Sequence, residues 1–336
     1  GVFHEADGPI SLDVTESGVG RDAEGNVVDK PGTPEENDEY TGNVFAGGKV
    51  AGFDVDNGHK LYFGLSQGSG GTLNDVIFNP ADSTAAGAPT YSKVEGHYGS
   101  MTIRADGTYT YKLEHQEQTF DTVQTAGGKF VTSVNNLNEG DTLTETFTFY
   151  VKDEHNAWSQ QEITVTITGT NDRPVLTVDQ GNDRYFNVDG TEVSDKAFTE
   201  DGGVTKVEGR VVATDADEEN GSGAETTATD HHGLTFSLTG GSSNWAWEGG
   251  SHQSAGTVSS DGKTITTDYG TLTIDEFGNY KYELNNAGEA VQKLGAGETV
   301  TETFTVRVMD DRGAWHEQDI SFTVNGTNDK TTVENT

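Results

Sequence analysis

Acidic residues stand at four matching points in the two halves of the chain, and grouped carboxylates are ligands for a hard cation. The points are an early Glu (Glu16; Glu200), a D-x-D (Asp54 and Asp56; Asp215 and Asp217), an acidic pair (Asp153 and Glu154; Asp310 and Asp311) and a closing Asn-Asp (Asn171 and Asp172; Asn328 and Asp329). Carboxylates held close together repel one another unless a cation lies among them. Because the chain has no Cys and no clustered His, these oxygen ligands favour calcium over zinc.

The D-x-D segments do not fit an EF-hand. If Asp54 or Asp215 is position one of the loop, position twelve is Leu65 or Thr226, so the bidentate Glu is missing. A single Asp-rich turn is more often a solvated loop than a metal site. The recurrence of all four acidic points in both halves reverses that preference.

One segment matches an enzyme motif. Gly64–Gly68 reads G-x-S-x-G, the pattern of a hydrolase nucleophile elbow, which requires a strand-to-helix turn with a distant His and Asp. Ser66 instead follows a strand-like run and enters a Gly-rich segment. We therefore expect no enzyme activity.

Two tryptophans in the second half, Trp245 and Trp247, have no counterpart in the first half. Aromatic faces on an exposed loop could stack on a sugar, so both are possible ligand contacts. A hairpin with one Trp on each side of a small cluster is the plainer account.

The elements that carry these residues are repeated. Residues 143–172 match residues 300–329 without a gap, 157 positions apart. Upstream, "YGSMTIRADGTYTYKL" matches "YGTLTIDEFGNYKYEL" at a different offset. Steady offsets inside blocks and jumps between them indicate conserved strands joined by loops of different length.

Inside the matched blocks apolar and polar residues alternate, which is typical of half-buried antiparallel strands. Gly107 and Gly278 are placed to take positive φ in tight turns that feed a strand. About seven strands per repeat predict an all-β fold of two tandem antiparallel β-sandwiches, immunoglobulin-like or cadherin-like. We expect the first sandwich at residues 1–174, with a linker tail at 1–10, and the second at 175–336, ending in a linker. The polar segments 18–42, 66–92, 114–140, 180–196 and 218–232 are expected to be surface loops that add little core, some with small hairpins.

The charge of the chain limits the classes of partner that it can bind. Asp and Glu number 56 against 20 Lys and Arg, a formal charge of -36, so nucleic acid and anionic membranes are repelled. The sequence has no run of about 18 apolar residues of the kind that could cross a bilayer, and its start lacks the features of a signal peptide. We expect a monomeric piece of a longer chain.

The motifs "VVATDADEENG", "FTEDGG", "MDDRG" and "GTNDRP" resemble those of VCBS or cadherin-like repeats in giant bacterial surface adhesins with RTX tails. The resemblance covers nearly the whole chain in two copies. It implies calcium sites between domains. At the internal junction the ligands would be Glu16, Asp153, Glu154, Asn171 and Asp172 with Asp215 and Asp217. A half site at the end would use Glu200, Asp310, Asp311, Asn328 and Asp329, and another at the start would use Asp7, Asp54 and Asp56.

The resemblance implies that the chain is a spacer in a secreted, cell-surface protein that mediates attachment or biofilm formation. It also implies export by type I secretion and stiffening by calcium between neighbouring repeats. Extracellular modules bind calcium with dissociation constants of about 0.1–1 mM, which suits a protein outside the cell. The rival expectation is an adhesion module that binds a surface glycan or protein.

Overall fold

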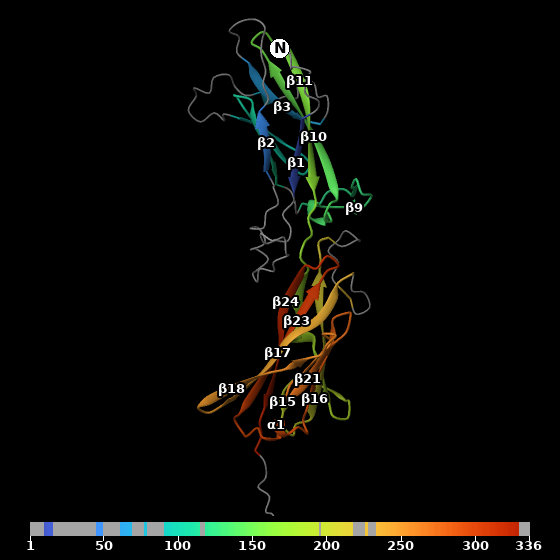
Figure 1. Ribbon diagram of the computed structural model, residues 1–336, viewed down its shortest axis with the longest axis vertical. Coiled ribbons are helices and arrows are strands. Elements are labelled where there is room, and N and C mark those ends of the chain that lie inside the picture. The colour runs from blue at the N-terminus through green and yellow to red at the C-terminus, as the bar shows by residue number, and fades with distance from the viewer. Residues whose placement is uncertain are drawn as a thin grey trace, which may run out of the picture. The chain divides into compact units, whose positions relative to one another are not determined.

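The computed structural model of the protein describes residues 10–15, 45–49, 61–68, 77–78, 91–114, 118–194, 196–217, 226–227 and 233–328 (Figure 1). The chain divides into two compact units, Gly1–Asp172 with Ala216–Ser222, and Arg173–Asp215 with Gly223–Thr336. The main division thus falls two residues before the predicted boundary at 174. Both units are built from strands, so the predicted all-β fold of two antiparallel sandwiches is confirmed.

Unit 1 packs a five-stranded sheet, β1-β11-β10-β3-β4, on a four-stranded sheet, β2-β7-β6-β5. Its core joins Phe147 and Val165 of the first sheet to Met101 and Ile103 of the second. The elements are β1 (Ile10–Thr15), β2 (Phe45–Lys49), β3 (Tyr62–Gln67), β4 (Ile77–Phe78), β5 (Tyr91–Glu95), β6 (Gly99–Arg104), β7 (Thr108–Leu113), β8 (Val123–Gln124), β9 (Phe130–Val131), the 3-10 turn η3 (Val134–Asn136), β10 (Thr142–Lys152) and β11 (Trp158–Thr168).

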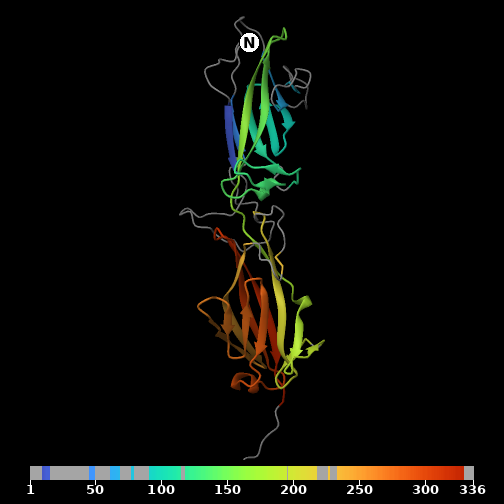
Figure 2. The same cartoon turned by 90° about the vertical axis from the view of Figure 1, so that its right-hand side faces the viewer.

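Unit 2 packs a five-stranded sheet, β15-β24-β23-β17-β18, on an eight-stranded sheet in which β16 and β22 are central. The layers can be followed in Figures 1 and 2. The elements are β12 (Val175–Val178), η4 (Gln180–Asn182), β13 (Arg184–Asn187), β14 (Glu192–Val193), β15 (Phe198–Thr199), β16 (Val204–Thr214), β17 (Thr235–Trp247), β18 (Gly250–Ala255), β19 (Thr257–Val258), β20 (Thr264–Thr266), β21 (Gly270–Ile274), β22 (Asn279–Leu284), α1 (Glu289–Gln292), β23 (Thr299–Met309) and β24 (Trp315–Asn325).

The repeat in the sequence is a repeat in the structure. β10 and β11 pair antiparallel from Thr142↔Thr168 to Lys152↔Trp158, and β23 and β24 pair identically 157 positions later. In each unit an early strand, β1 or β15, runs parallel to the last strand. Gly107 and Gly278 both have φ of +82°, so the predicted turns before β7 and β22 are confirmed.

The polar segments contribute more core than their composition suggested. Val131 and Val134 from segment 114–140 are fully buried in unit 1. Tyr185 and Phe186 from segment 180–196 are also buried, because β13 pairs with β16. The expectation of surface loops with little core is wrong for these two segments, while the expected small hairpins occur as β8–β9 and β13–β14.

Candidate functional site

The last two strands of each unit form a long hairpin, which gives the unit two distinct ends. We call the end at the connecting turn (Asp153–Ala157 in unit 1, Asp310–Ala314 in unit 2) the turn pole. The end where the last strand runs out (Gly169–Asp172, Gly326–Asn328) is the exit pole. Ten residue steps separate the two along the hairpin, or about 33 Å at the usual strand rise.

Asp153 and Asp310 organise their turns in the same way. One carboxylate oxygen of Asp153, Oδ1, accepts the backbone N–H groups of His155 at 2.8 Å and Ala157 at 2.9 Å. The corresponding oxygen of Asp310 accepts those of residues 312 and 314, both at 2.9 Å. Both aspartates are buried, whereas Glu154 and Asp311 are exposed. The buried acid of each pair therefore shapes its turn whether or not a cation binds.

The predicted grouping of these turns with the closing Asn-Asp is wrong. Asp153 and Glu154 lie at the turn pole of unit 1, at the far end of the hairpin from Asn171 and Asp172. In unit 2, Asp310 and Asp311 lie equally far from Asn328. A hairpin brings its first and last residues together and sends its turn away, so no single ion could touch both sets.

The turn pole of unit 2 brings different acids together. β16 ends at Thr214, opposite Val175, and Asp215 follows it. Leu176, which follows Val175, donates its N–H to the His316 ring at 2.9 Å. His316 pairs with Val308, and one strand pair separates it from the Asp310 turn. Asp215 therefore shares a pole with Asp310 and Asp311.

Glu200 lies at the exit pole of unit 2 and is fully buried. Its N–H donates to the Asn325 carbonyl at 2.8 Å, and its Oε2 accepts the Thr327 N–H at 3.0 Å. Its Oε1 is buried and accepts no hydrogen bond from the described residues. Such an oxygen costs free energy that a bound cation would offset, so this pole fits a calcium ion. In unit 2 the Thr of the G-T-N-D ending, Thr327, thus holds the early Glu of the repeat.

At the exit pole of unit 1, three predicted residues lie together. By their contacts Ala216 and Asp217 belong to this unit, and Asp217 accepts the Asp172 N–H at 2.6 Å. Asn171 is buried and donates to the Asp172 carbonyl at 3.0 Å. Sequence analysis missed Lys129, whose ammonium donates to the Asp217 carbonyl at 2.9 Å and brings a positive charge to this pole.

The remaining predicted ligands lie outside the described residues: Asp7, Glu16, Asp54, Asp56 and Asp329. Within the described ranges, no three Asp, Glu or His side chains are close enough to hold a metal ion. The calcium sites therefore stay a prediction.

A buried carboxyl group faces a tyrosine in each unit, and sequence analysis overlooked both. In unit 1 Glu145 accepts from the Tyr111 hydroxyl at 2.5 Å. In unit 2 Glu302 accepts from the hydroxyls of Tyr282, Thr267 and Ser243. Burial raises the pKa of both glutamates, although these hydrogen bonds act in the opposite direction. Tyr111 and Tyr282 belong to the hydrophobic cores of their units, so both pairs contribute to the cores.

Ser66 lies inside β3 rather than at a strand-to-helix turn. It is buried, and its hydroxyl donates to the Tyr150 hydroxyl at 3.2 Å. This geometry does not present a nucleophile.

Trp245 and Trp247 lie in the predicted hairpin, which is formed by β17 and β18. Because they are two residues apart in one strand, both side chains project from the same face. Their ring centroids are 4.8 Å apart, so the picture of one Trp on each side of a cluster is wrong.

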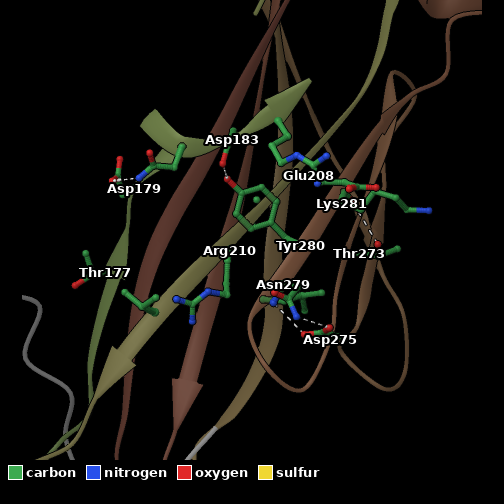
Figure 3. A pocket seen from close by; sticks show the side chains of 15 residues that line it. Thr177, Asp179, Asp183, Glu208, Arg210, Thr273, Asp275, Asn279, Tyr280 and Lys281 are labelled. Carbon is green, nitrogen blue, oxygen red and sulfur yellow. Dashed lines mark hydrogen bonds between the residues drawn. The ribbon is translucent and has the colours of Figure 1, made fainter. Parts of the chain in front are cut away.

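A groove of about 950 Å³, lined mostly by polar residues, lies in unit 2 beside β16 and β22 (Figure 3). β12 and β13 both pair with β16, and the residues between them leave its edge open near Gly209. Figure 3 shows the Tyr280 hydroxyl directed at Asp183, and that hydrogen bond measures 2.5 Å. Arg210 and Lys281 also line the groove. Burial raises the pKa of Asp183. Tyr280 is only 3% exposed, so the groove offers no free ring face.

Comparisons with known proteins gave structural similarity alone. No protein-family model matches the sequence, and no curated protein matches it significantly. Mouse cadherin-23 EC22-24 is similar over 96% of this chain and 64% of its own, with 13% identity and a TM-score of 0.30. Protocadherin gamma B2 cadherin domains 3-6 are similar over 94% of this chain and 45% of their own, with 10% identity and a TM-score of 0.32. Human CDH23 EC21-23 is similar over 94% of this chain and 72% of its own, with 12% identity and a TM-score of 0.29. Values this low assign neither family nor function. No helix among the described residues is long and apolar enough to span a membrane.

Proposed function

We propose that this chain is a spacer segment of a large secreted bacterial adhesin, of the VCBS or cadherin-like kind, whose successive units are stiffened by calcium. Such a segment would hold an adhesive end away from the cell surface during attachment or biofilm formation. Its partners are neighbouring repeats of its own chain. The observation that carries the proposal is Glu200, a fully buried carboxylate with one oxygen that accepts no hydrogen bond from the described residues.

The ligand sets of the proposal follow the two poles. In chain order, the exit pole of one repeat is followed at once by the turn pole of the next. The internal set is therefore Glu16, Asn171 and Asp172 with Asp215, Asp217, Asp310 and Asp311. The set at the end of the chain is Glu200, Asn328 and Asp329, and the set at its start is Asp7, Asp54, Asp56, Asp153 and Glu154.

Repulsion among carboxylates supplies the physical switch. At a charge of -36, acids that gather at a pole repel one another until a cation neutralises them. With an affinity of about 0.1–1 mM, calcium would bind outside a cell and not in the cytosol. The chain would then pass through its exporter flexible and become stiff after release.

Small-angle scattering tests this proposal. The wild-type chain should show a larger, more uniform maximum dimension in calcium than in EDTA, and Asp172→Ala or Asp217→Ala should reduce the difference. Glu95→Ala, which removes an exposed carboxylate of unit 1 that belongs to no proposed ligand set, is the matched control and should scatter as wild type does in both conditions. Identical scattering of the wild type in calcium and in EDTA would refute the proposal.

A further inference from the structure

A second cavity of unit 2 lies against Trp245, and none of the proposed cation ligands lines it. It measures about 500 Å³, within the range of small-ligand sites. The lining comes from β17, β18, the turn before β21, and α1: Trp245, His252, Asp268, Tyr269, Glu289, Ala290 and Lys293.

The aromatic rings form one wall of this cavity. Trp245 packs against the core of unit 2 on one side and lines the cavity on the other. His252 lies directly opposite it in the β17–β18 ladder. Trp247 contacts the Trp245 ring, is 36% exposed and lies across Gly250, where a Cβ would meet its ring at 2.8 Å. The aromatic surface therefore continues from the cavity to the hairpin tip.

Packing alone does not account for a tryptophan at position 245. Its Nε1–H is buried and has no acceptor among the described residues. A phenylalanine would fill core space without that unpaired donor. At the hairpin tip Trp247, the last residue of β17, lies one position beyond the last pair of β17 with β23, Ala246↔Thr299. Figure 1 shows β18 extending to the side of unit 2.

The polar groups of the cavity suit a neutral, hydroxyl-rich ligand. Carboxylates of Asp268 and Glu289 can accept hydrogen bonds from hydroxyls, and Lys293 and His252 can donate to ring or hydroxyl oxygens. Lys293 and Glu289 form an exposed ion pair with each other, which leaves the Asp268 charge to repel an anion. The apolar C–H face of a sugar ring matches the Trp245 and His252 rings. The groove beside Tyr280 is larger but lacks such a ring face.

From this arrangement we infer that unit 2 binds a neutral saccharide in the cavity lined by Trp245 and His252. The site gives the spacer a recognition function of its own. It uses none of the acids of the proposed calcium sets, so binding persists in EDTA.

An array of neutral and acidic glycans, probed with the full chain in EDTA and again in calcium, tests this inference. Neutral glycans should bind in both conditions, and titration of the tightest of them should change tryptophan fluorescence. His252→Ala and Trp247→Ala should weaken that binding about tenfold, the expected size of a lost ring contact. Trp158→Ala, which removes an exposed ring from unit 1, should leave it unchanged.

Trp245→Phe keeps an aromatic ring in the core and guards against misfolding as an explanation. It should fold with wild-type circular dichroism and bind more weakly. The inference is overturned if no neutral glycan binds, if only acidic glycans or peptides bind, or if His252→Ala and Trp247→Ala both bind as wild type does.

Discussion

The buried pair of Tyr282 and Glu302 offers a sharp test of how the core of unit 2 is held together. Glu302 is fully buried, and the Tyr282 hydroxyl is one of three side-chain donors to it. Tyr282→Phe keeps the ring, which stacks on Phe322 at a centroid distance of 4.5 Å, and deletes only the hydroxyl. Leaving a buried acceptor short of a donor costs about 1–3 kcal/mol. For a domain of this size the melting temperature should fall by about 2–12 °C.

The loss should depend on pH in a defined direction. Burial raises the pKa of Glu302, and the Tyr282 hydrogen bond partly offsets this, so the variant should raise the pKa further. A carboxyl whose folded pKa exceeds its unfolded value stabilises the fold below the unfolded pKa. That contribution is lost as the pH rises through the folded pKa. The free-energy difference between wild type and Tyr282→Phe should therefore shrink from pH 7.5 toward pH 5.

Chemical unfolding of the full chain at the two pH values measures both effects. Tyr185→Phe is the control, because its hydroxyl makes no hydrogen bond to the described residues. Tyr111→Phe repeats the experiment on Glu145 in unit 1. The reasoning is refuted if Tyr282→Phe and Tyr185→Phe lose the same stability at both pH values.

Two further pairs of variants test the turn pole and the groove of unit 2. In EDTA, where no cation contributes, Asp310→Ala removes the acceptor of two turn N–H groups and should cost about 1–2 kcal/mol in chemical unfolding, while the exposed Asp311→Ala should change stability by about 0.5 kcal/mol or less; equal losses would contradict the assigned role of Asp310. In Gly209→Ala the new Cβ would stand 2.1 Å from Asp183 Oδ1 and should lower the melting temperature, whereas Gly240→Ala meets only Thr305 Oγ1 at 3.8 Å. A Gly209→Ala chain as stable as Gly240→Ala would show that the groove rearranges freely.

The strands of the matched blocks could be predicted because alternation and turn chemistry act locally. Phe147 and Val165 face the core as the period of two requires, and Gly107 marks its turn by its freedom at positive φ. The buried glutamates had a signal too. Glu145 lies on the inward face of β10 with Leu143 and Phe147. A search for acidic residues at positions where the alternation expects an apolar residue would have found it.

The grouping of acids into sites could not be predicted from the same signals. Alternation shows where a strand ends but not at which end of the sandwich that point lies. The pole of Asp153 follows only from the pairing of β10 with β11. Likewise, the contacts of Lys129 with Asp217 and of Asp183 with Tyr280 join residues 88 and 97 positions apart, and no local pattern announces them.

Thermal melting in calcium against EDTA, with Glu200→Gln beside the wild type, tests the central claim most directly. At about 10 mM calcium and an affinity of about 0.1–1 mM, each occupied site adds about 1.4–2.7 kcal/mol. The melting temperature of unit 2 should then rise by about 3–11 °C. Gln keeps an oxygen for the Thr327 N–H but removes the charge, so the variant should lose most of the rise at unit 2 and keep its stability in EDTA. Melting of the wild type that is indifferent to calcium would contradict the account.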